Sequence, residues 1–173
     1  MIAHNAQPAA PPAAPEELRA LMAGFPTGVT VITAFDAAGR PWGMTCSSLC
    51  SVTLRPPTLL VCVRNGSPTL AAVLEGGRFS VNLLGGAGRP VAELFASGAS
   101  DRFDHVKWQD APGGGGPHLP HDAHAVADCR VLKTEAVGDH TVVYGQVEQT
   151  VVFAQAPQPL IYGLRSYAVW PAP

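Results

Sequence analysis

The segment VADCRVLKTEAVGDHTVVYGQVEQTVVF (residues 126–153) has the pattern of two long β-strands joined by a tight turn. Between Val143 and Val151, apolar and polar side chains alternate, as a strand with one buried face requires. Gly138 and Asp139 tolerate the backbone angles of a hairpin, so we expect residues 126–137 and 140–153 to pair. A hairpin of this length favours a mainly β fold.

Shorter segments of similar character flank this hairpin. The further predicted strands are residues 28–35, 58–63, 78–84 and 159–163, with another strand leading into residues 43–52. Short helices are predicted at residues 16–25, 67–77 and 88–98. In the first of these, Leu18, Leu21 and Met22 share one face. Six or seven strands with short helices inserted fit a closed β-barrel with helical excursions better than a doubly wound sheet.

The composition indicates one compact domain. The chain has 173 residues, of which 47% are hydrophobic and 14% charged, and its net charge of −2 gives no support for nucleic-acid binding. Residues 1–15 are rich in Ala and Pro, so we expect a disordered tail followed by a domain over residues 16–173. The N-terminus lacks the pattern of a secretory signal, and no apolar run reaches the roughly 18 residues of a membrane span. We therefore expect a cytoplasmic protein.

The four cysteines do not have the spacing of a zinc site or a disulfide framework. Cys46 and Cys50 are four residues apart, which on a strand separates them by about 13 Å. They could share a metal or a disulfide only if the chain turned sharply between them. We interpret the cysteines as buried small residues with free thiols.

Three histidines in the segment 109–124 raise the possibility of a metal site. His118, His121 and His124 recur every third residue, but they follow a run of four glycines and several prolines. A metal needs rigidly held ligands, so we interpret this segment as a solvated, flexible loop and expect no metal. The glycine run also lacks the Gly-Lys-Ser/Thr ending of a phosphate-binding loop, and the sequence has neither a Gly-x-Ser-x-Gly elbow nor a Gly-x-Gly-x-x-Gly fingerprint.

The segment GMTCSSLCSV (residues 43–52) carries small hydroxyl and thiol side chains between two apolar runs. Beyond it, Arg64, Ser67 and Thr69 surround the predicted start of the helix at residues 67–77, where a phosphate would be favoured. The alternatives are that Ser67 is an ordinary N-cap and Thr69 a solvated residue of the first turn.

The order of several motifs resembles the short-chain flavin reductases, the reductase components of two-component flavin-dependent monooxygenases. These motifs are Gly-Met-Thr-x-Ser-Ser, Ser-Val-x-Leu-x-Pro-Pro, Phe-x-Val-Asn, Arg-Phe and Gly-Asp-His, and the match runs from about Leu18 to about Trp170. No single motif decides the resemblance, but the whole set in this order is specific.

The resemblance implies a split, Greek-key-like β-barrel that binds flavin at a homodimer interface. It places the flavin ring and ribityl chain against Gly43, Met44, Thr45, Cys46, Ser47 and Ser48. It places the flavin phosphate near Cys62, Val63, Arg64, Ser67 and Thr69. The rest of the flavin site would be Phe95, Ala96, Arg102 and Phe103. His140 is the implied catalytic candidate beside the nicotinamide, whose pocket would be bordered by Tyr162, Gly163 and Tyr167.

The implied activity is that of an NAD(P)H:flavin oxidoreductase. It would pass a hydride from nicotinamide C4 to N5 of FMN or FAD and supply reduced flavin to a partner monooxygenase. Such chemistry needs no protein nucleophile, because it needs only two stacked rings and stabilisation of charge on the flavin. The alternative is a non-catalytic split-barrel protein that stores or senses flavin. A pyridoxamine-phosphate type of oxidase is disfavoured, because the 11 Lys and Arg residues are not clustered.

Overall fold

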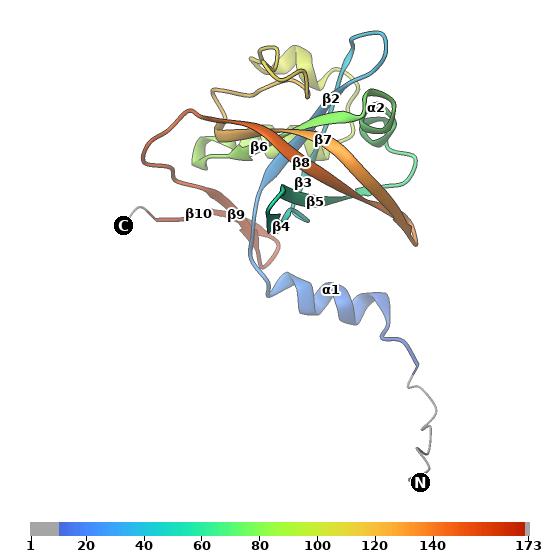
Figure 1. Cartoon of the computed structure of the whole chain (residues 1–173). Helices are drawn as coiled ribbons and strands as arrows, with labels where there is room; N and C mark the ends of the chain where they lie inside the picture. The colour runs from blue at the N-terminus through green and yellow to red at the C-terminus, as the bar shows by residue number, and fades with distance from the viewer. Residues whose placement is uncertain (1–10, 172–173) are drawn as a thin grey trace.

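The computed structural model describes residues 11–171, and the chain there is mainly β (Figure 1). The strands are β1 Thr27–Gly28, β2 Thr30–Phe35, β3 Pro41–Cys46, β4 Cys50–Leu54, β5 Pro57–Arg64, β6 Arg78–Leu84, β7 Ala123–Val137, β8 His140–Val152, β9 Leu160–Gly163 and β10 Ser166–Val169. The α-helices are α1 Pro15–Ala23, α2 Pro68–Gly76 and α3 Arg89–Ala96, with 3₁₀ turns η1 Gly86–Gly88 and η2 Arg102–His105. The mainly β fold class is therefore confirmed.

Seven strands form one antiparallel sheet in the order β3-β2-β6-β7-β8-β5-β4. Its centre is the predicted hairpin, in which Val137 pairs with His140 across a turn where Gly138 has φ 57°. The sheet curls around a buried apolar cluster that includes Ile32, Val63 and Phe79. Within the described chain, β3 and β4 are its two unpaired ends, so the barrel is split rather than closed by a continuous hydrogen-bond ladder.

A second, three-stranded sheet has the order β1-β9-β10, and its strand β10 has no counterpart among the predicted elements. The predicted strand 28–35 is in fact divided between the two sheets. Val29 lies at the division: its N–H donates to Leu160 O at 3.0 Å, and its carbonyl accepts from Leu84 N at 3.0 Å. One buried residue thus joins the smaller sheet to the barrel.

The helices follow the sequence signals to different degrees. Helix α2 lies within the predicted range, with Ser67 at its N-cap position and Gly77 ending it in the left-handed region at φ 63°. Helix α1 ends two residues earlier than predicted and buries none of its residues against the described chain. Its apolar face, Leu18, Leu21 and Met22, is exposed, and Figure 1 shows the helix projecting from the barrel. No helix in residues 11–171 is long and apolar enough to cross a membrane.

The interpretation of residues 109–124 as a solvated loop is wrong for its second half. His118 is fully buried, and its Nε2 lies 2.8 Å from Asp128 Oδ1, which also accepts from Ser80 Oγ at 2.5 Å. Asn82 holds the same segment by donating to Pro117 O at 3.2 Å and accepting from Leu119 N at 2.9 Å. Inward-facing polar groups of the barrel therefore hold residues 117–119 in place by hydrogen bonds. A flexible, solvated loop would not make such buried hydrogen bonds.

The other histidines of that segment are separate from the buried pair. His121 is exposed and His124 is half-buried, where burial lowers its pKa. Within residues 11–171, no three His, Cys, Asp or Glu side chains are gathered as a metal would require.

Three glycines of the run, Gly113, Gly115 and Gly116, pack closely against the barrel, whereas Gly114 is exposed. A Cβ atom at Gly116 would overlap the backbone carbonyl of Thr33 and lie 2.7 Å from Ala34 N. Because Thr33 and Ala34 lie on β2, a strand paired on both sides whose backbone cannot move aside, the Gly116→Ala variant should lose about 1–3 kcal/mol of unfolding free energy. Urea unfolding measures this loss. The matched variant Gly28→Ala, whose Cβ would meet nothing within 4 Å, should change by much less, and equal losses would contradict the packing described here.

Candidate active site

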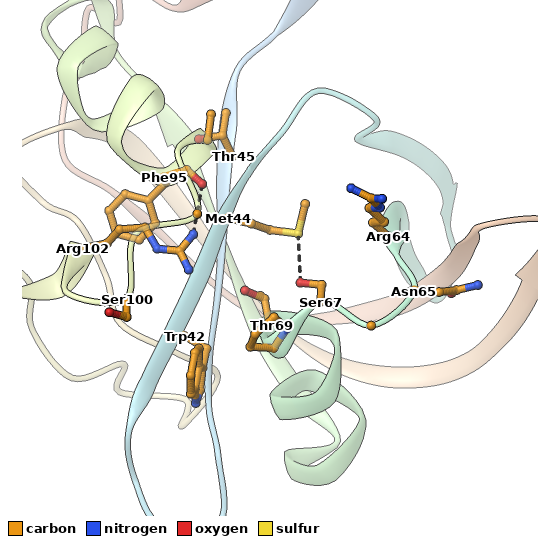
Figure 2. A pocket seen from close by; sticks show the side chains of 14 residues that line it. Trp42, Met44, Thr45, Arg64, Asn65, Ser67, Thr69, Phe95, Ser100 and Arg102 are labelled. Carbon is orange, nitrogen blue, oxygen red and sulfur yellow. Dashed lines mark hydrogen bonds between the residues drawn. The ribbon is translucent and has the colours of Figure 1, made fainter. Parts of the chain in front are cut away.

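A cavity of about 830 Å³ opens between β3, the start of α2, and the chain that follows α3 (Figure 2). Its lining consists of Trp42, Met44, Thr45, Arg64, Asn65, Gly66, Ser67, Pro68, Thr69, Phe95, Ala96, Gly98, Ser100 and Arg102. Eight of these were predicted as flavin-site residues: Met44, Thr45, Arg64, Ser67, Thr69, Phe95, Ala96 and Arg102. Because β3 is an end strand of the sheet, it is not covered by a neighbouring strand on the side away from β2.

The start of α2 presents hydroxyl groups to this cavity. Ser67 occupies the N-cap position, but its hydroxyl makes no capping hydrogen bond within the described chain and instead donates to Met44 Sδ at 3.8 Å. Thr69 is buried, so its interpretation as a solvated residue is wrong. Two hydroxyls at the positive end of a helix, with the Arg64 side chain beside them (Figure 2), form an anion-binding arrangement.

Arg102 brings a buried positive charge to the same cavity. Only 8% of the residue is exposed, and its Nη1 donates to Phe95 O at 3.2 Å. Its Cζ lies 5.8 Å from the centre of the Phe95 ring. Burial lowers the pKa of the guanidinium, yet an arginine remains charged at neutral pH. Among residues 11–171, no carboxylate lies within ion-pair distance of it, so the cavity holds a cation that an anionic ligand would neutralise.

The segment from Thr45 to Ser48 uses its own hydroxyls to hold its shape. Thr45 Oγ1 donates to Ala92 O at 2.6 Å. Ser48 Oγ donates to Cys62 O at 3.2 Å and accepts from Cys62 N at 2.9 Å, while Cys46 Sγ lies 3.1 Å from it. The hydroxyls of Thr45 and Ser48 are therefore already engaged in hydrogen bonds within the protein. Free donors are present in the backbone, because the N–H groups of residues 47–49 make no hydrogen bond within residues 11–171.

Several predicted residues lie behind the cavity wall rather than on it. A Cβ at Gly43 would lie 2.8 Å from Phe95 Cε1 and 3.1 Å from Phe103 Cζ, so this glycine permits β3 to pack closely against α3. The Phe103 ring meets the Phe95 ring edge-on at 5.0 Å. Cys46 and Val63 belong to the buried core, and burial raises the pKa of the Cys46 thiol. Cys62 is partly buried, and its backbone contacts Ser48 as described above.

The thiols differ in burial, so one interpretation needs correction. Cys46 and Cys129 are buried as expected, and burial raises the pKa of Cys129 to about 12. Cys50, at the start of β4, is exposed. All four are free thiols.

A second cavity of about 600 Å³ lies between α1 and the β9–β10 hairpin, and it reaches the segment 45–48 at Ser47 and Ser48. Its lining consists of Arg19, Met22, Ala23, Phe25, Thr27, Ser47, Ser48, Tyr162, Gly163 and Arg165. Tyr167 stands beside it, with its ring 5.0 Å from that of Tyr162. The predicted site is thus divided between two cavities that adjoin the stretch 44–48.

His140 lies outside both cavities. Its Nδ1 is 2.8 Å from Asp139 Oδ1, and this hydrogen bond lowers the pKa of the Asp139 carboxyl. His140 pairs with Arg64 across β8 and β5, which places both side chains on one face of the sheet. Since Arg64 lines the first cavity, His140 stands next to its rim rather than within it.

Six lining residues of the first cavity were not predicted from the sequence: Trp42, Asn65, Gly66, Pro68, Gly98 and Ser100. Asn65 to Pro68 lie within the turn between Arg64 and Thr69, so the signal for them was their position between two predicted residues. Trp42 directly precedes Gly43 near the start of a strand, and no sequence pattern there indicates that its side chain lines a cavity.

Comparison with known proteins identifies the family. The flavin reductase like domain matches residues 22–171. The chain belongs to the flavin reductase-like family. It is 55% identical over 152 residues to a flavin reductase (NADPH) of Lentzea aerocolonigenes, with 88% of each chain covered. It is 45% identical over 151 residues to a flavin reductase (NADH) of Kitasatospora aureofaciens, covering 87% of this chain and 79% of the relative.

Solved structures of flavin reductases share the fold. An NADH:FAD oxidoreductase of Streptomyces globisporus, solved with NAD and FAD fragments, superposes with a TM-score of 0.82 at 30% identity and covers 92% of this chain and 96% of its own. The styrene monooxygenase flavin reductase of Pseudomonas putida gives a TM-score of 0.81 at 32% identity, covering 91% and 99%. The split barrel described above is therefore the fold of known flavin reductases.

The Ser48 bridge generates a prediction for this flavin reductase-like chain. Ser48→Ala removes the partner of the Cys62 N–H and should lower the unfolding free energy by about 1–2 kcal/mol, because a partly buried donor is left unpaired. Thermal or urea unfolding measures the difference. Ser47→Ala is the matched control: Ser47 is exposed, and a change within about 0.5 kcal/mol is expected. Similar losses in the two variants would show that the bridge does not hold the segment.

Proposed function

We propose that this protein catalyses the reduction of FMN or FAD by NADH or NADPH, using the cavity beside β3 for the flavin. The observation that carries the proposal is that one cavity is lined by the buried Arg102, by the hydroxyl residues Ser67 and Thr69 at the start of α2, and by Met44 and Thr45 of β3. The protein is an oxidoreductase of the flavin reductase-like family, as its relatives of 55% and 45% identity are.

The residues present fit a flavin. Arg102, Ser67 and Thr69 offer a cation and two hydroxyls suited to a phosphate, and Arg64 and Ser100 lie beside them. The uncovered edge of β3 leaves backbone N–H and C=O groups open to a ligand. The free N–H groups of residues 47–49, which follow the cavity wall just beyond Thr45, are suited to the carbonyl groups at the edge of the flavin ring. These assignments are supported by the chemistry of the side chains and by the burial of the charge.

Bound flavin would supply the redox chemistry, accepting at N5 the hydride that leaves C4 of the nicotinamide. The chain's part is to bind, orient and exclude water. The backbone N–H groups of residues 47–49 would stabilise negative charge at the ring edge, because they are already oriented by the Ser48 bridge. The nicotinamide would stack on the open face of the flavin ring, because the hydride passes only between rings in contact. The second cavity, with Tyr162 and Tyr167 at its border, would be the approach to that face. Its aromatic rings limit the access of water.

His140 is proposed to act at the nicotinamide end of the reaction, by orienting the carboxamide or donating a proton. Its position beside Arg64, at the rim of the first cavity, supports a role near bound ligand. Its hydrogen bond to Asp139 would hold the ring in one orientation.

We propose further that the working form is a homodimer. The end strand β4 is exposed at every residue, with Leu54 82% exposed, and α1 exposes Leu21 at 72%. An uncovered strand edge next to exposed apolar side chains favours pairing with another chain. The second cavity lies beside α1, so a partner molecule on this face would also enclose that cavity. Sedimentation mass tests the assembly.

Reduced flavin would pass to a separate oxygenase or related flavin-dependent enzyme. Two similar proteins are reductase components of such systems. One is the reductase subunit of a stachydrine N-demethylase, at 40% identity, and the other is the flavin reductase component of a two-component tryptophan halogenase, at 28%. We place the reaction in the cytoplasm, because four free thiols suit a reducing compartment.

The purified full-length protein should oxidise NADPH or NADH only when FMN or FAD is added, with a kcat on the order of 1–1,000 s⁻¹. Loss of nicotinamide absorbance in air measures the rate, and omission of flavin is the control. Tight flavin binding without turnover would instead favour the alternative of a storage or sensing protein, and absence of both would contradict the proposed function.

His140→Ala should lower kcat/KM for the nicotinamide by about tenfold or more while the flavin Kd changes by less than about twofold, because the residue acts outside the flavin cavity. Steady-state kinetics and flavin titration give the two values. His121→Ala serves as the control, because His121 is exposed and lines neither of the two cavities. Equal loss of turnover and flavin binding would assign His140 to the fold or the flavin site.

A further inference from the structure

Trp42 lines the flavin cavity but has no part in the function proposed so far. It lies on β3, two residues before Met44, and Figure 2 shows its ring at the end of the cavity beyond Thr69 and Ser100. Among the described lining residues, it and Phe95 are the aromatic ones. Phe95 is only 1% exposed and has the Arg102 guanidinium over its ring, whereas Trp42 is partly exposed. Trp42 is therefore the aromatic surface that a ligand in this cavity can reach.

The indole ring is held in place from two sides. Its Nε1–H donates to Asp36 Oδ2 at 3.0 Å, and Arg40 Cζ lies 5.9 Å from the ring centre. The indole hydrogen bond, together with those from Arg40, lowers the pKa of Asp36 to about 2, so the carboxylate stays ionised at neutral pH. Asp36 is itself fixed, because it accepts from the N–H groups of Ala38 and Arg40 in the β2–β3 turn. A ring fixed before binding loses little freedom when a second ring stacks on it.

The position of Trp42 along β3 indicates which part of a ligand it would meet. From Thr45 to Trp42 the strand advances about 10 Å, in the direction away from residues 46–48. If the isoalloxazine ring lies against Met44 and Thr45, toward residues 46–48, and its phosphate reaches Arg102 and the start of α2, the group beyond that phosphate lies at Trp42. In a dinucleotide that group is adenosine. The cavity volume of about 830 Å³ is near the upper end of the range of about 300–1,000 Å³ for ligand pockets, which suits a ligand larger than a mononucleotide.

We propose that Trp42 is a stacking surface for the adenine ring of a dinucleotide and so gives this cavity a preference for FAD over FMN. The inference rests on the proposed function, because it takes the flavin phosphate to bind at Arg102. The same adenine chemistry is present in NAD(P)H, so the experiment separates the two sources. Stacking of a base on an aromatic face needs no hydrogen bonds to the base, so Trp42 could serve without further polar partners.

The test compares flavin binding in wild type, Trp42→Leu and Trp42→Phe, each in the full chain. Flavin-fluorescence titration should give a Kd for FAD about tenfold weaker in Trp42→Leu, equivalent to about 1.4 kcal/mol, with the Kd for FMN within about twofold. Trp42→Phe should retain most of the FAD affinity, because it keeps an aromatic face. Trp170→Leu is the matched control, since Trp170 is 59% exposed and outside the cavity, and it should change neither value.

The kinetic arm identifies the source of the adenine. Trp42→Leu could leave both flavin affinities unchanged but raise the KM for NADPH relative to the KM for reduced nicotinamide mononucleotide. That result would mean that the adenine of the nicotinamide coenzyme occupies the site. The stacking role would then stand, and the preference for FAD would be withdrawn. Equal weakening of FMN and FAD, or no change in any value, overturns the stacking role.

A third measurement needs no variant and decides the matter if Trp42→Leu does not fold. Adenosine added to the wild type should raise the apparent Kd for FAD and leave that for FMN unchanged. Adenosine that affects neither flavin, nor the KM for NADPH, also overturns the stacking role. Failure of the proposed function is distinguishable, because it would appear as absence of FMN binding and of FMN-dependent NAD(P)H oxidation in the wild type.

Discussion

The candidate site depends on the close packing of β3 against α3. β3 pairs with a strand on only one side, so its position is fixed largely by contacts across its face. Gly43 makes these contacts possible, because any side chain there would meet Phe95 and the backbone of β2. Thr45 adds a hydrogen bond to α3 at Ala92. These contacts hold β3 rigidly, while its edge away from β2 stays uncovered. A ligand can therefore lie along this edge without displacing another strand.

Charge is distributed in a way that suits a phosphate. Most ion pairs of the described chain are on the surface, such as those of Arg19 and Arg89 with nearby glutamates, and these contribute little to stability. Arg102 differs because it is buried and has only a backbone carbonyl as partner. Burying a charge in this way is unfavourable by itself, and binding of an anion would offset that cost. Arg102 is therefore better explained by ligand binding than by the stability of the fold.

Much of the fold could be predicted from local patterns. The strand 78–84 has the bounds that its alternation predicted, and α2 is framed by the Ser67, Pro68 and Gly77 signals. The four-glycine run was misread, because local sequence indicates flexibility whereas the burial of Gly116 depends on a strand more than eighty residues earlier in the chain. The division of the first long strand was likewise invisible locally, since only the position of Leu160 makes it necessary.

The site was predictable where motifs of the family cover it and less so elsewhere. Arg64 was predicted from its place before a helix start and Arg102 from the resemblance, and the structure brings them to one cavity. Their neighbours Ser100 and Trp42 belong to no motif, and their place in the cavity follows from how the chain folds back on itself. The engagement of the Thr45 and Ser48 hydroxyls also required the structure, because their partners Ala92 and Cys62 are distant in sequence.

Val29 has a consequence for how the molecule opens. Its N–H is bonded to the small sheet and its carbonyl to the barrel, so neither sheet can separate at β1 without breaking a bond of the other. The amide protons on both sides of this residue should then exchange with solvent together, as parts of one cooperative unit. Motions that open the second cavity must accordingly arise in α1 or at the tip of the β9–β10 hairpin, where Leu164 and Arg165 carry positive φ angles, rather than in the seam between the sheets.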